Sequence, residues 1–434
     1  MARQELINRR SFMKDAIGTT AAFTIVPRHV LGGSGYTAPS DRLTKAVIGC
    51  GIMGHAHIAS PPNRGAILAV CDVDENHLQN AVNAVGNGVK GYRDFREVLD
   101  RQDIDVVIIA TPPHWHGLIA IAAADAGKDI VCEKPMTRTI AEGQKLVEAV
   151  RRNGTILRVN TWGRFGGKLA GDESSAKLVK KLINSGMLGL PLRVTVSRAT
   201  GFSKLDGEFL GEVDLKPQPV PPELDYNMWL GPAPYKPYHP LRVHAVEGYE
   251  GGEGFRGYWD YDGGNLGDMG QHYLDPVQYV MGKDDTSPVE IIPDTTQQHP
   301  DAVRPWHQVH MKYADETELI LESVNHNKDA PFIEGPKGKL YLGFKSDIPN
   351  LKEKVAALPD PEPQMTNFQL AIRTRQRFGL NEQNGHRSCS LINLGKIALR
   401  LGRPLRYEPD KQRFINDEEA NRFINQPMRA PWHL

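Results

Sequence analysis

A glutamate and a lysine stand directly after an apolar run that reads as a buried strand. The run is Ile130–Cys132, and Glu133-Lys134-Pro135 follows it. A buried charge is costly without a partner, so such a pair needs either a counter-ion or a purpose. Because the carboxyl end of a parallel strand faces the ligand crevice of a doubly wound sheet, we interpret Glu133 and Lys134 as site residues. The alternative is an ion pair on the surface.

Asp268 and His272 form a second pair that could do chemistry. If a helix begins near Gly267, the two residues lie four apart on one face of it. A carboxylate so placed can orient and polarise an imidazole, the usual proton acceptor near neutral pH. The alternative is an aspartate that caps the helix beside an unrelated histidine. Pro276 is expected to disturb this helix one turn later.

The segment 110–116, Ala-Thr-Pro-Pro-His-Trp-His, follows another apolar run and so falls at the same edge of the predicted sheet. Its two histidines, His114 and His116, could suggest a metal pair. With no third ligand nearby and no HExxH motif, metal has little support. We expect instead a contact to cofactor or substrate. Helix capping and aromatic packing around Trp115 is the alternative.

A glycine loop predicts what the crevice binds. Gly49-x-Gly51-x-x-Gly54 follows the apolar residues 46–48. Gly49 permits a tight turn, Gly51 lets the backbone approach a pyrophosphate, and Gly54 lets the next helix pack close to the strand. Asp72 ends a second apolar run about 20 residues on, where the fingerprint has an acid that binds ribose hydroxyls. An ordinary strand–turn–helix with a surface aspartate is the alternative.

The elements that must position these residues alternate between strand and helix patterns. Such alternation predicts an α/β fold with a doubly wound parallel sheet and crossover helices, here a dinucleotide-binding domain over 44–162. We expect strands at 45–48, 66–72, 105–110, 130–132 and 156–159, and helices at 75–85, 95–100, 116–126 and 140–152.

The second half, 163–434, reads as a separate α/β domain with a largely antiparallel open sheet. Successive strand patterns joined by short turns support this reading. A loop-rich stretch, 201–264, is dense in Tyr and Trp, which argues against disorder. We expect helices at 174–184, 367–377 and 388–401, and strands at 192–198, 289–292, 307–313, 318–323 and 339–343.

Bulk properties narrow the classes of function. At 434 residues the chain is long enough for two domains. Its formal net charge of zero gives no reason to expect a nucleic-acid partner. The sequence contains no apolar run of about 18 residues, so no membrane-spanning helix is predicted. The four cysteines form no CxxC pair, and we expect them to be small core residues without disulfides.

The N-terminal residues 1–35 predict export. Arg9-Arg10 precedes the weakly apolar stretch 16–26, an arrangement typical of twin-arginine signals. A periplasmic location is therefore expected. A basic, disordered tail is the alternative reading.

Taken together, these features resemble the glucose–fructose oxidoreductase / inositol dehydrogenase / MocA (Gfo/Idh/MocA) family. The glycine loop, Thr111-Pro112 with His116, Glu133-Lys134-Pro135 and Asp268-x-x-x-His272 occur in the family's order. The resemblance runs from about Thr44 to the C-terminus, and the tail looks like that of exported bacterial members. The stretch 201–264 has no confident match, which leaves the substrate open.

The resemblance implies a Rossmann domain, a nicotinamide cofactor, and a second domain whose sheet often forms a subunit interface in a homo-oligomer. It implies that Lys134 orients substrate and cofactor, that Asp268 holds substrate or imidazole, and that His272 takes the hydroxyl proton. The residues expected to bind the cofactor are Gly49, Gly51, Ile52, Met53, Gly54, Asp72, Thr111, Pro112, His116, Glu133 and Lys134.

The expected function is that of an NAD-dependent oxidoreductase acting on a hydroxyl of a sugar, polyol or glycoside. NAD is expected over NADP because the charge of Asp72 repels a 2′-phosphate. Free NAD is scarce outside the cytoplasm, so an exported enzyme is expected to keep its cofactor bound. Two alternatives stay open: a redox-assisted glycosidase or lyase, and a non-catalytic sugar-binding protein on the same fold.

Overall fold

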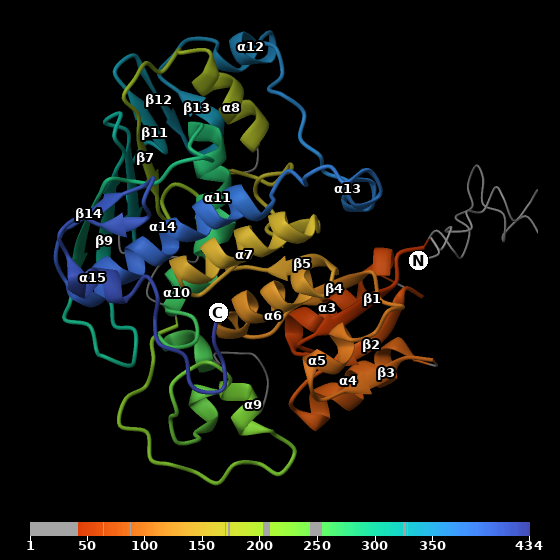
Figure 1. The fold of residues 1–434 in the computed structure, drawn as a ribbon. Helices are drawn as coiled ribbons and strands as arrows, with labels where there is room; N and C mark the ends of the chain where they lie inside the picture. The colour runs from red at the N-terminus through yellow and green to blue at the C-terminus, as the bar shows by residue number, and fades with distance from the viewer. Residues whose placement is uncertain are drawn as a thin grey trace, which may run out of the picture. The chain divides into compact units, whose positions relative to one another are not determined.

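The computed structural model describes residues 42–434 except 64, 87, 170, 172–173, 203–208, 244–253, 324–326 and 328. The expected targeting segment with Arg9 and Arg10 lies outside the described residues. Two β-sheets organise the chain from Thr44 to Leu434, which forms one unit (Figure 1).

The first sheet has six parallel strands in the order β3-β2-β1-β4-β5-β6. Every residue of β1, β4 and β5 is buried, as expected for parallel strands covered on both faces. The order reverses between β1 and β4, which is where a doubly wound sheet opens a ligand crevice. The strands are β1 Lys45–Ile48, β2 Ile67–Cys71, β3 Lys90–Tyr92, β4 Val106–Ile109, β5 Asp129–Glu133 and β6 Leu157–Asn160.

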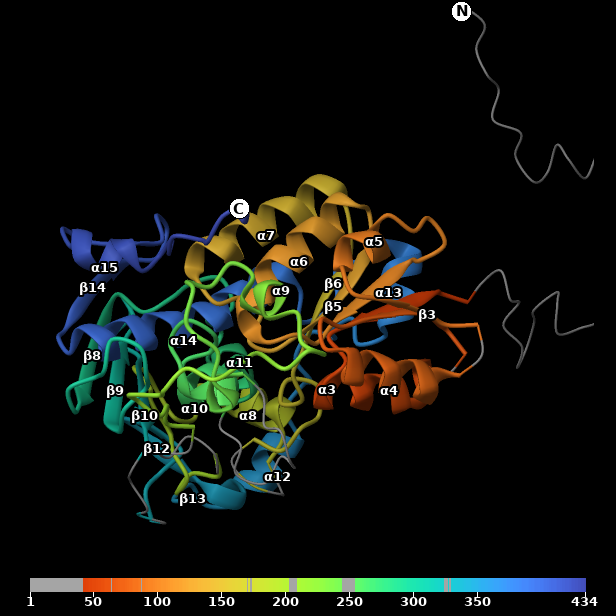
Figure 2. The same ribbon diagram turned by 90° about the horizontal axis from the view of Figure 1, so that it is seen from below.

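Helices cover both faces of this sheet. Figure 2 shows α5, α6 and α7 on one side and α3 and α4 on the other. Side-chain caps fix several starts: Asp74 accepts from two backbone N–H groups of α4, and Thr139 accepts from one of α7. The helices are α3 Ile52–Ala59, η3 Pro61–Asn63, α4 Glu75–Val85, α5 Phe95–Leu99, α6 Pro113–Asp125 and α7 Ile140–Asn153. The predicted doubly wound domain is confirmed.

The second sheet has nine strands in the order β13-β12-β11-β7-β10-β9-β8-β14-β15. Apart from the parallel pair β7–β10, neighbouring strands run antiparallel, which confirms the predicted largely antiparallel sheet. The strands are β7 Arg193–Val196, β8 Glu290–Thr295, β9 Trp306–Lys312, β10 Glu318–Glu322, β11 Ile333–Gly335, β12 Gly338–Tyr341, β13 Lys345–Ser346, β14 Leu405–Glu408 and β15 Arg413–Phe414.

Helices α8, α11 and α14 pack against one face of the second sheet and bury its main hydrophobic core (Figure 1). The helical segments of this half are α8 Ala176–Asn184, α9 Tyr226–Leu230, η4 Pro240–Arg242, η5 Gly254–Gly257, α10 Gly264–Asp268, α11 Gly270–Met281, η6 Leu342–Phe344, α12 Leu351–Ala356, α13 Phe368–Thr374, α14 Glu382–Leu401 and α15 Glu418–Arg422.

The helix that carries His272 differs from the prediction. A short helix, α10, ends at Asp268, and α11 begins anew at Gly270. The expected single helix starting near Gly267 is therefore wrong. Pro276 lies inside α11, which continues to Met281. Pro276 has no N–H group, so α11 lacks one backbone hydrogen bond. The helix continues because nearly all of its residues are buried against the rest of the domain.

Within its described residues, 201–202, 209–243 and 254–264, the loop-rich stretch contains an ordered aromatic cluster. Tyr226, Trp229, Tyr238, Tyr258 and Tyr261 are all buried there. Rings of this size bury large apolar areas, so they hold irregular backbone in place. This agrees with the expectation that the aromatic residues would be ordered.

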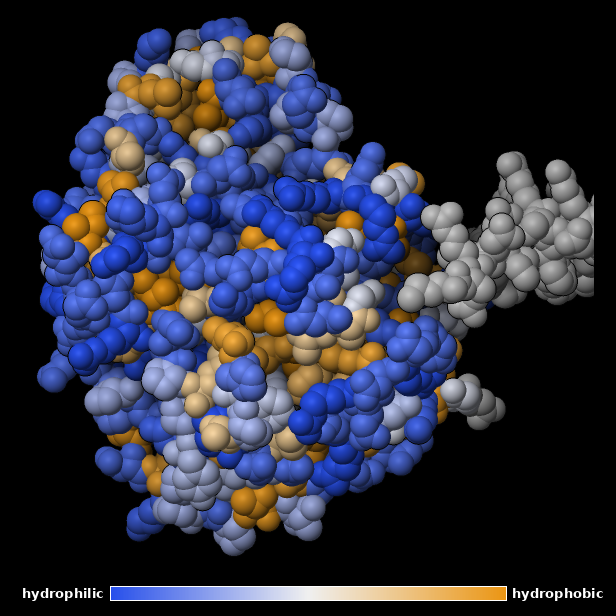
Figure 3. Space-filling view, in the orientation of Figure 1, coloured by the Kyte–Doolittle hydropathy of each residue, from blue (hydrophilic) through white to orange (hydrophobic). Residues whose placement is uncertain are grey.

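Hydrophilic side chains cover most of the face seen in Figure 3, and apolar residues gather near its middle, around α6. Among the described helices, none combines the length and the apolar character needed to cross a bilayer. All four cysteines are free and buried.

Candidate active site

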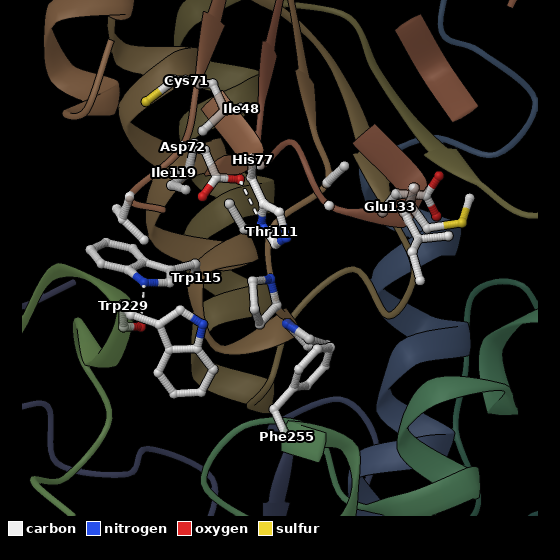
Figure 4. Close-up of a pocket in the computed structure, with 18 of the residues that line it drawn as sticks. Ile48, Cys71, Asp72, His77, Thr111, Trp115, Ile119, Glu133, Trp229 and Phe255 are labelled. Atoms are coloured by element: carbon white, nitrogen blue, oxygen red, sulfur yellow. Dashed lines mark hydrogen bonds and ion pairs between the residues drawn. The ribbon is translucent and has the colours of Figure 1, made fainter. Parts of the chain in front are cut away.

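A cavity of about 430 Å³ lies over the carboxyl ends of the parallel strands. One wall comes from the first domain, and the facing wall comes from the second (Figure 4). The first wall includes Gly49, Gly51, Ile52, Met53, Asp72, Thr111, Pro112, Glu133 and Lys134, and the second includes Trp229, Phe255, Arg256 and Asp268. The structure thus brings most of the predicted site residues together around one space.

The three glycines of the loop have different surroundings. Gly49 has φ of +89°, and a Cβ on it would lie 2.5 Å from the backbone nitrogen of Thr111. A Cβ on Gly54 would overlap the carbonyl oxygen of Gly49, so only glycine lets α3 pack against β1. A Cβ on Gly51 would meet nothing within 4 Å. The open side of Gly51 faces the cavity, where a pyrophosphate can approach the start of α3.

Asp72 stands at the end of β2 with its carboxylate held by backbone groups. Its Oδ2 accepts from the Cys50 N–H at 2.6 Å, and its Oδ1 accepts from the Asp74 N–H at 2.9 Å. Burial raises the pKa of Asp72, while the nearby His77 ring and these two N–H groups oppose the rise. The carboxylate is therefore fixed at the position where a ribose would present its hydroxyls.

Glu133 is pinned at the end of β5 by two residues that the sequence did not single out. His57 of α3 contacts its Oε1 at 2.7 Å, and Asn160 of β6 donates to the same oxygen at 2.6 Å. Burial alone would raise the pKa of Glu133, but the bonds from His57 and Asn160 lower it below its usual value. Glu133 therefore ties the glycine-loop helix to the end of β5, which Lys134 follows directly.

His114 and His116 were expected to contact the cofactor or substrate, but neither of them lines the cavity. His116 is buried, with its two ring nitrogens 2.7 Å from the Pro135 carbonyl oxygen and 2.8 Å from that of Thr111. His114 is also buried and lies 2.9 Å from the Trp229 carbonyl oxygen. Both histidines hold loops of the cavity wall in place, so a direct role in binding the cofactor is not supported for either.

Lys134 and Asp268 meet across 134 positions of sequence. The Lys134 ammonium donates to Asp268 Oδ1 at 3.0 Å, and Arg256 donates to the same oxygen at 3.1 Å. Although burial alone would raise it, these two cations lower the pKa of Asp268 to about 2. Arg256, from the loop-rich stretch, was missed by the sequence reasoning because no local pattern marks it. A second carboxyl, that of Asp262, has its pKa raised to about 8 by burial and by Asp268.

His272 lies in the first turn of α11, close enough to Lys134 and Asp268 for their charges to act on its ring, but it is not one of the residues that line the cavity. Asp268 binds cations instead of the imidazole, and His272 Nδ1 has no hydrogen-bond partner among the described residues. The expected Asp268–His272 bond is therefore not formed. Burial, and next the charge of Lys134, lower the pKa of His272 to about 3. The imidazole is neutral at pH 7 and able to accept a proton.

The residues of the cavity fit a dinucleotide. The cavity is bordered by the open space above Gly51 and by the fixed carboxylate of Asp72. Thr111 also lines it, and its buried hydroxyl has no hydrogen-bond partner among the residues that the structure describes. Gly49, Gly51, Ile52 and Met53 would hold the phosphates, and Asp72 the ribose. Within the described ranges there is no group of three or more His, Cys, Asp or Glu residues placed to hold a metal ion.

One known protein family matches both halves of the chain, with a separate domain model for each half. The oxidoreductase family's NAD-binding Rossmann fold, GFO_IDH_MocA, matches residues 43–161. The same family's C-terminal alpha/beta domain matches residues 173–434.

Curated relatives match over part of their length. Inositol 2-dehydrogenase of Salmonella typhimurium is 31% identical over 156 residues, which are 35% of this chain and 44% of the relative. D-apiose dehydrogenase of Paraburkholderia graminis is 30% identical over 177 residues, which are 40% of this chain and 45% of the relative. The matches thus span less than half the length of these relatives.

Solved structures share the fold at low sequence identity. The WlbA dehydrogenase from Bordetella pertussis, in complex with NADH and UDP-GlcNAcA, has a TM-score of 0.55 and 18% identity, over 85% of this chain and 99% of that one. The aldose-aldose oxidoreductase from Caulobacter crescentus, complexed with glycerol, has a TM-score of 0.52 and 18% identity, over 84% of this chain and 99% of that one.

Proposed function

The chain belongs to the Gfo/Idh/MocA oxidoreductase family, and we propose that it is an NAD-dependent dehydrogenase acting on a hydroxyl group of a sugar, polyol or glycoside. One observation carries the proposal. Lys134 and Asp268 are ion-paired at the wall of the cavity that the glycine loop borders, and His272 lies beside them. The names of the curated relatives, which are dehydrogenases of inositol and D-apiose, support the substrate class.

The protein's part is to bind, orient and deprotonate the substrate. NAD⁺, when bound, supplies the hydride acceptor. The Lys134 ammonium, fixed by Asp268, can donate a hydrogen bond to the substrate oxygen and favour its developing negative charge. The neutral imidazole of His272 takes the hydroxyl proton. Trp229 and Phe255 line the cavity with aromatic surface from the second domain (Figure 4).

The experiment begins with denaturation of the purified protein and identification of any released nucleotide. Cofactor-free protein is then reloaded with NAD⁺ and offered a panel of polyols, sugars and glycosides, with formation of reduced nicotinamide as the readout. Turnover of at least one compound is expected. Release of sugar from a glycoside without net reduction would instead identify a redox-assisted glycosidase or lyase. Sugar affinity without nucleotide binding would identify a binding protein.

We also propose that the second sheet forms the interface of a homo-oligomer. Alternate side chains of β9 and β10, among them His310, Lys312 and Ile320, are partly exposed on the face opposite the helices. An Ile320→Arg variant should shift light-scattering mass toward the monomer. The same change at Leu370, an exposed residue of α13, is the control. An unchanged mass for Ile320→Arg would contradict this interface.

Export to the periplasm by the twin-arginine route is proposed from Arg9-Arg10 and the apolar stretch that follows. Replacing both arginines by lysine should leave folded protein in the cytoplasm. An unchanged periplasmic yield would reject the proposal.

A further inference from the structure

Trp162 combines exposure with a close contact to the proposed proton acceptor. The residue follows β6 by two positions, and 58% of its surface is exposed. Its ring is stacked on that of His272, with centroids 3.7 Å apart and an angle of 2° between the planes. A tryptophan usually buries most of its surface for hydrophobic stabilisation. Core packing therefore does not account for the position of this side chain.

The backbone around Trp162 is built to hold it on α11. A Cβ on Gly163 would lie 2.6 Å from Cγ of Pro276 and 3.0 Å from the His272 carbonyl oxygen. The chain can come this close to α11 only because that residue is glycine. Arg164 follows at once, and its buried guanidinium bonds Asp275 of α11 at 2.7 Å. The stacked arrangement thus rests on a glycine contact and a buried ion pair on its C-terminal side.

The charged groups around His272 make protonation of its ring difficult. Burial and the Lys134 ammonium disfavour the imidazolium, while Glu133 and Asp268 favour it, and the pKa lies well below its ordinary value. A neutral ring is ready to accept a proton, but the imidazolium that results needs stabilisation. The face of an indole attracts cations, and more strongly where water is excluded. In the stacked geometry, Trp162 presents that face to the ring.

We propose that Trp162 is a positioning residue that acts through His272, holding the plane of the imidazole and stabilising the imidazolium formed during oxidation. The proposal rests on the proposed function. In the step concerned, the substrate O–H bond breaks and its proton goes to a ring nitrogen of His272. NAD⁺, when bound, would accept the hydride of the same carbinol carbon, so that formation of one carbonyl is balanced by reduction of one nicotinamide.

The test compares Trp162→Leu, which removes the aromatic face, with Trp162→Phe, which keeps one. Tyr235→Leu is the matched control, because Tyr235 is also an exposed aromatic residue, at 68%, but its ring is not stacked on His272. We expect kcat to fall about 10- to 100-fold in Trp162→Leu and to recover most of this loss in Trp162→Phe. The KM for NAD⁺ and the melting temperature should stay close to those of wild type.

The dependence of kcat on pH is a second measurement, and it would be unchanged if Trp162 had only a structural role. The base must be neutral, so activity rises as pH passes upward through the pKa of His272. Both variants uncover part of the imidazole, and only Trp162→Phe keeps an aromatic face beside it. The rise should therefore lie at lower pH in Trp162→Leu than in Trp162→Phe, and the plateau should be lower. Equal losses in the Leu and Phe variants with a lowered melting temperature would overturn the proposal. So would a higher sugar KM with unchanged kcat, which would make Trp162 a substrate platform.

NMR of the His272 ring at neutral pH separates failure of this proposal from failure of the proposed function. The His272 signals are identified by their loss in His272→Gln. A ring-current shift of these signals that is present in wild type, kept in part in Trp162→Phe and lost in Trp162→Leu supports the role of the aromatic face even if no compound on the panel is turned over. Identical His272 signals in all three proteins would overturn it even if wild type proves to be an active dehydrogenase.

Discussion

The contacts among Lys134, Asp268 and His272 differ from those that their spacing in the sequence predicted. Asp268 was expected to polarise the imidazole, but it holds the Lys134 ammonium and the Arg256 guanidinium. The reason is local: the helix breaks at Met269, so the i, i+4 relation that would join Asp268 to His272 does not exist. The carboxylate thus fixes a cation, and the imidazole stays neutral and available.

Substitution of these three residues should separate chemistry from folding. His272→Ala should lower kcat by about 10²- to 10⁴-fold, because a general base is lost. Asp268→Asn should keep the shape and lose part of the rate, because Lys134 loses its counter-ion. Lys134→Ala should impair both kcat and KM for the substrate. Single-turnover hydride transfer and melting curves provide the measurements, and near-normal turnover with a lowered melting temperature in His272→Ala would refute the mechanism.

Asp72 should decide between the two nicotinamide cofactors. Its carboxylate is fixed by the N–H groups of Cys50 and Asp74 and cannot easily turn away from a 2′-phosphate. NAD should therefore bind more tightly than NADP, and Asp72→Ser should narrow the difference. Titration of cofactor-free protein with each nucleotide checks this. Tighter binding of NADP to wild type would show that Asp72 has another role.

At the scale of elements, two glycines of the strand–loop–helix unit β1–α3 are expected to have different roles, one in packing and one in cofactor binding. A Cβ on Gly54 overlaps the Gly49 carbonyl oxygen, whereas a Cβ on Gly51 meets only open space. Gly54→Ala should lower the melting temperature, because α3 must move away from β1. Gly51→Ala should keep the wild-type melting temperature and weaken NAD⁺ binding, because the methyl group occupies the approach of the pyrophosphate. Equal melting temperatures for both variants would contradict this assignment.

Strands with a buried apolar run were predictable from sequence, and elements set by tertiary contacts were not. β1, β2 and β4 lie within a residue of the expected spans. β3 was missed, because a three-residue edge strand with one buried side chain carries no period. α14 begins at Glu382, six residues before the expected Ser388, where an Asn381 capping box starts a turn of polar and small residues.

The site was predictable in part for a similar reason. The glycine loop and Asp72 are marked by local spacing, and Glu133-Lys134 by its place after a strand. Arg256, His57 and Asn160 reach the site only through folding, since their partners lie 12, 76 and 27 positions away in sequence. No local pattern distinguishes such residues from ordinary polar ones.

At the scale of the whole molecule, three buried histidines predict a loss of stability in acid. Burial lowers the pKa of His114 and His272 to about 3 and that of His386 to about 4, from 6.5. The unfolded chain binds protons at these sites below pH 6.5, while the folded protein does not until about pH 4. Their contribution is therefore fully present above pH 6.5 and is lost as pH falls toward 3–4.

The size of this effect can be measured by denaturant unfolding between pH 7 and pH 5. Each proton contributes about 1.4 kcal/mol per pH unit, so the three sites together contribute a slope of up to about 4 kcal/mol per unit near pH 5. His386→Gln, distant from the cavity, should remove about a third of that slope. A slope unchanged in this variant would show that His386 takes up its proton in the folded state.

The C-terminal segment returns to the first domain. Trp432 packs edge-on against Trp115, with ring centroids 4.7 Å apart, and Arg429 donates to the Gly231 carbonyl oxygen beside α9. Trp115 in turn lines the cavity. During synthesis the first domain can fold as soon as it emerges. The residues that pack behind this wall of the cavity, however, are translated about 270 codons after residue 162, where the first domain ends. A nascent chain stalled before them leaves that wall unsupported.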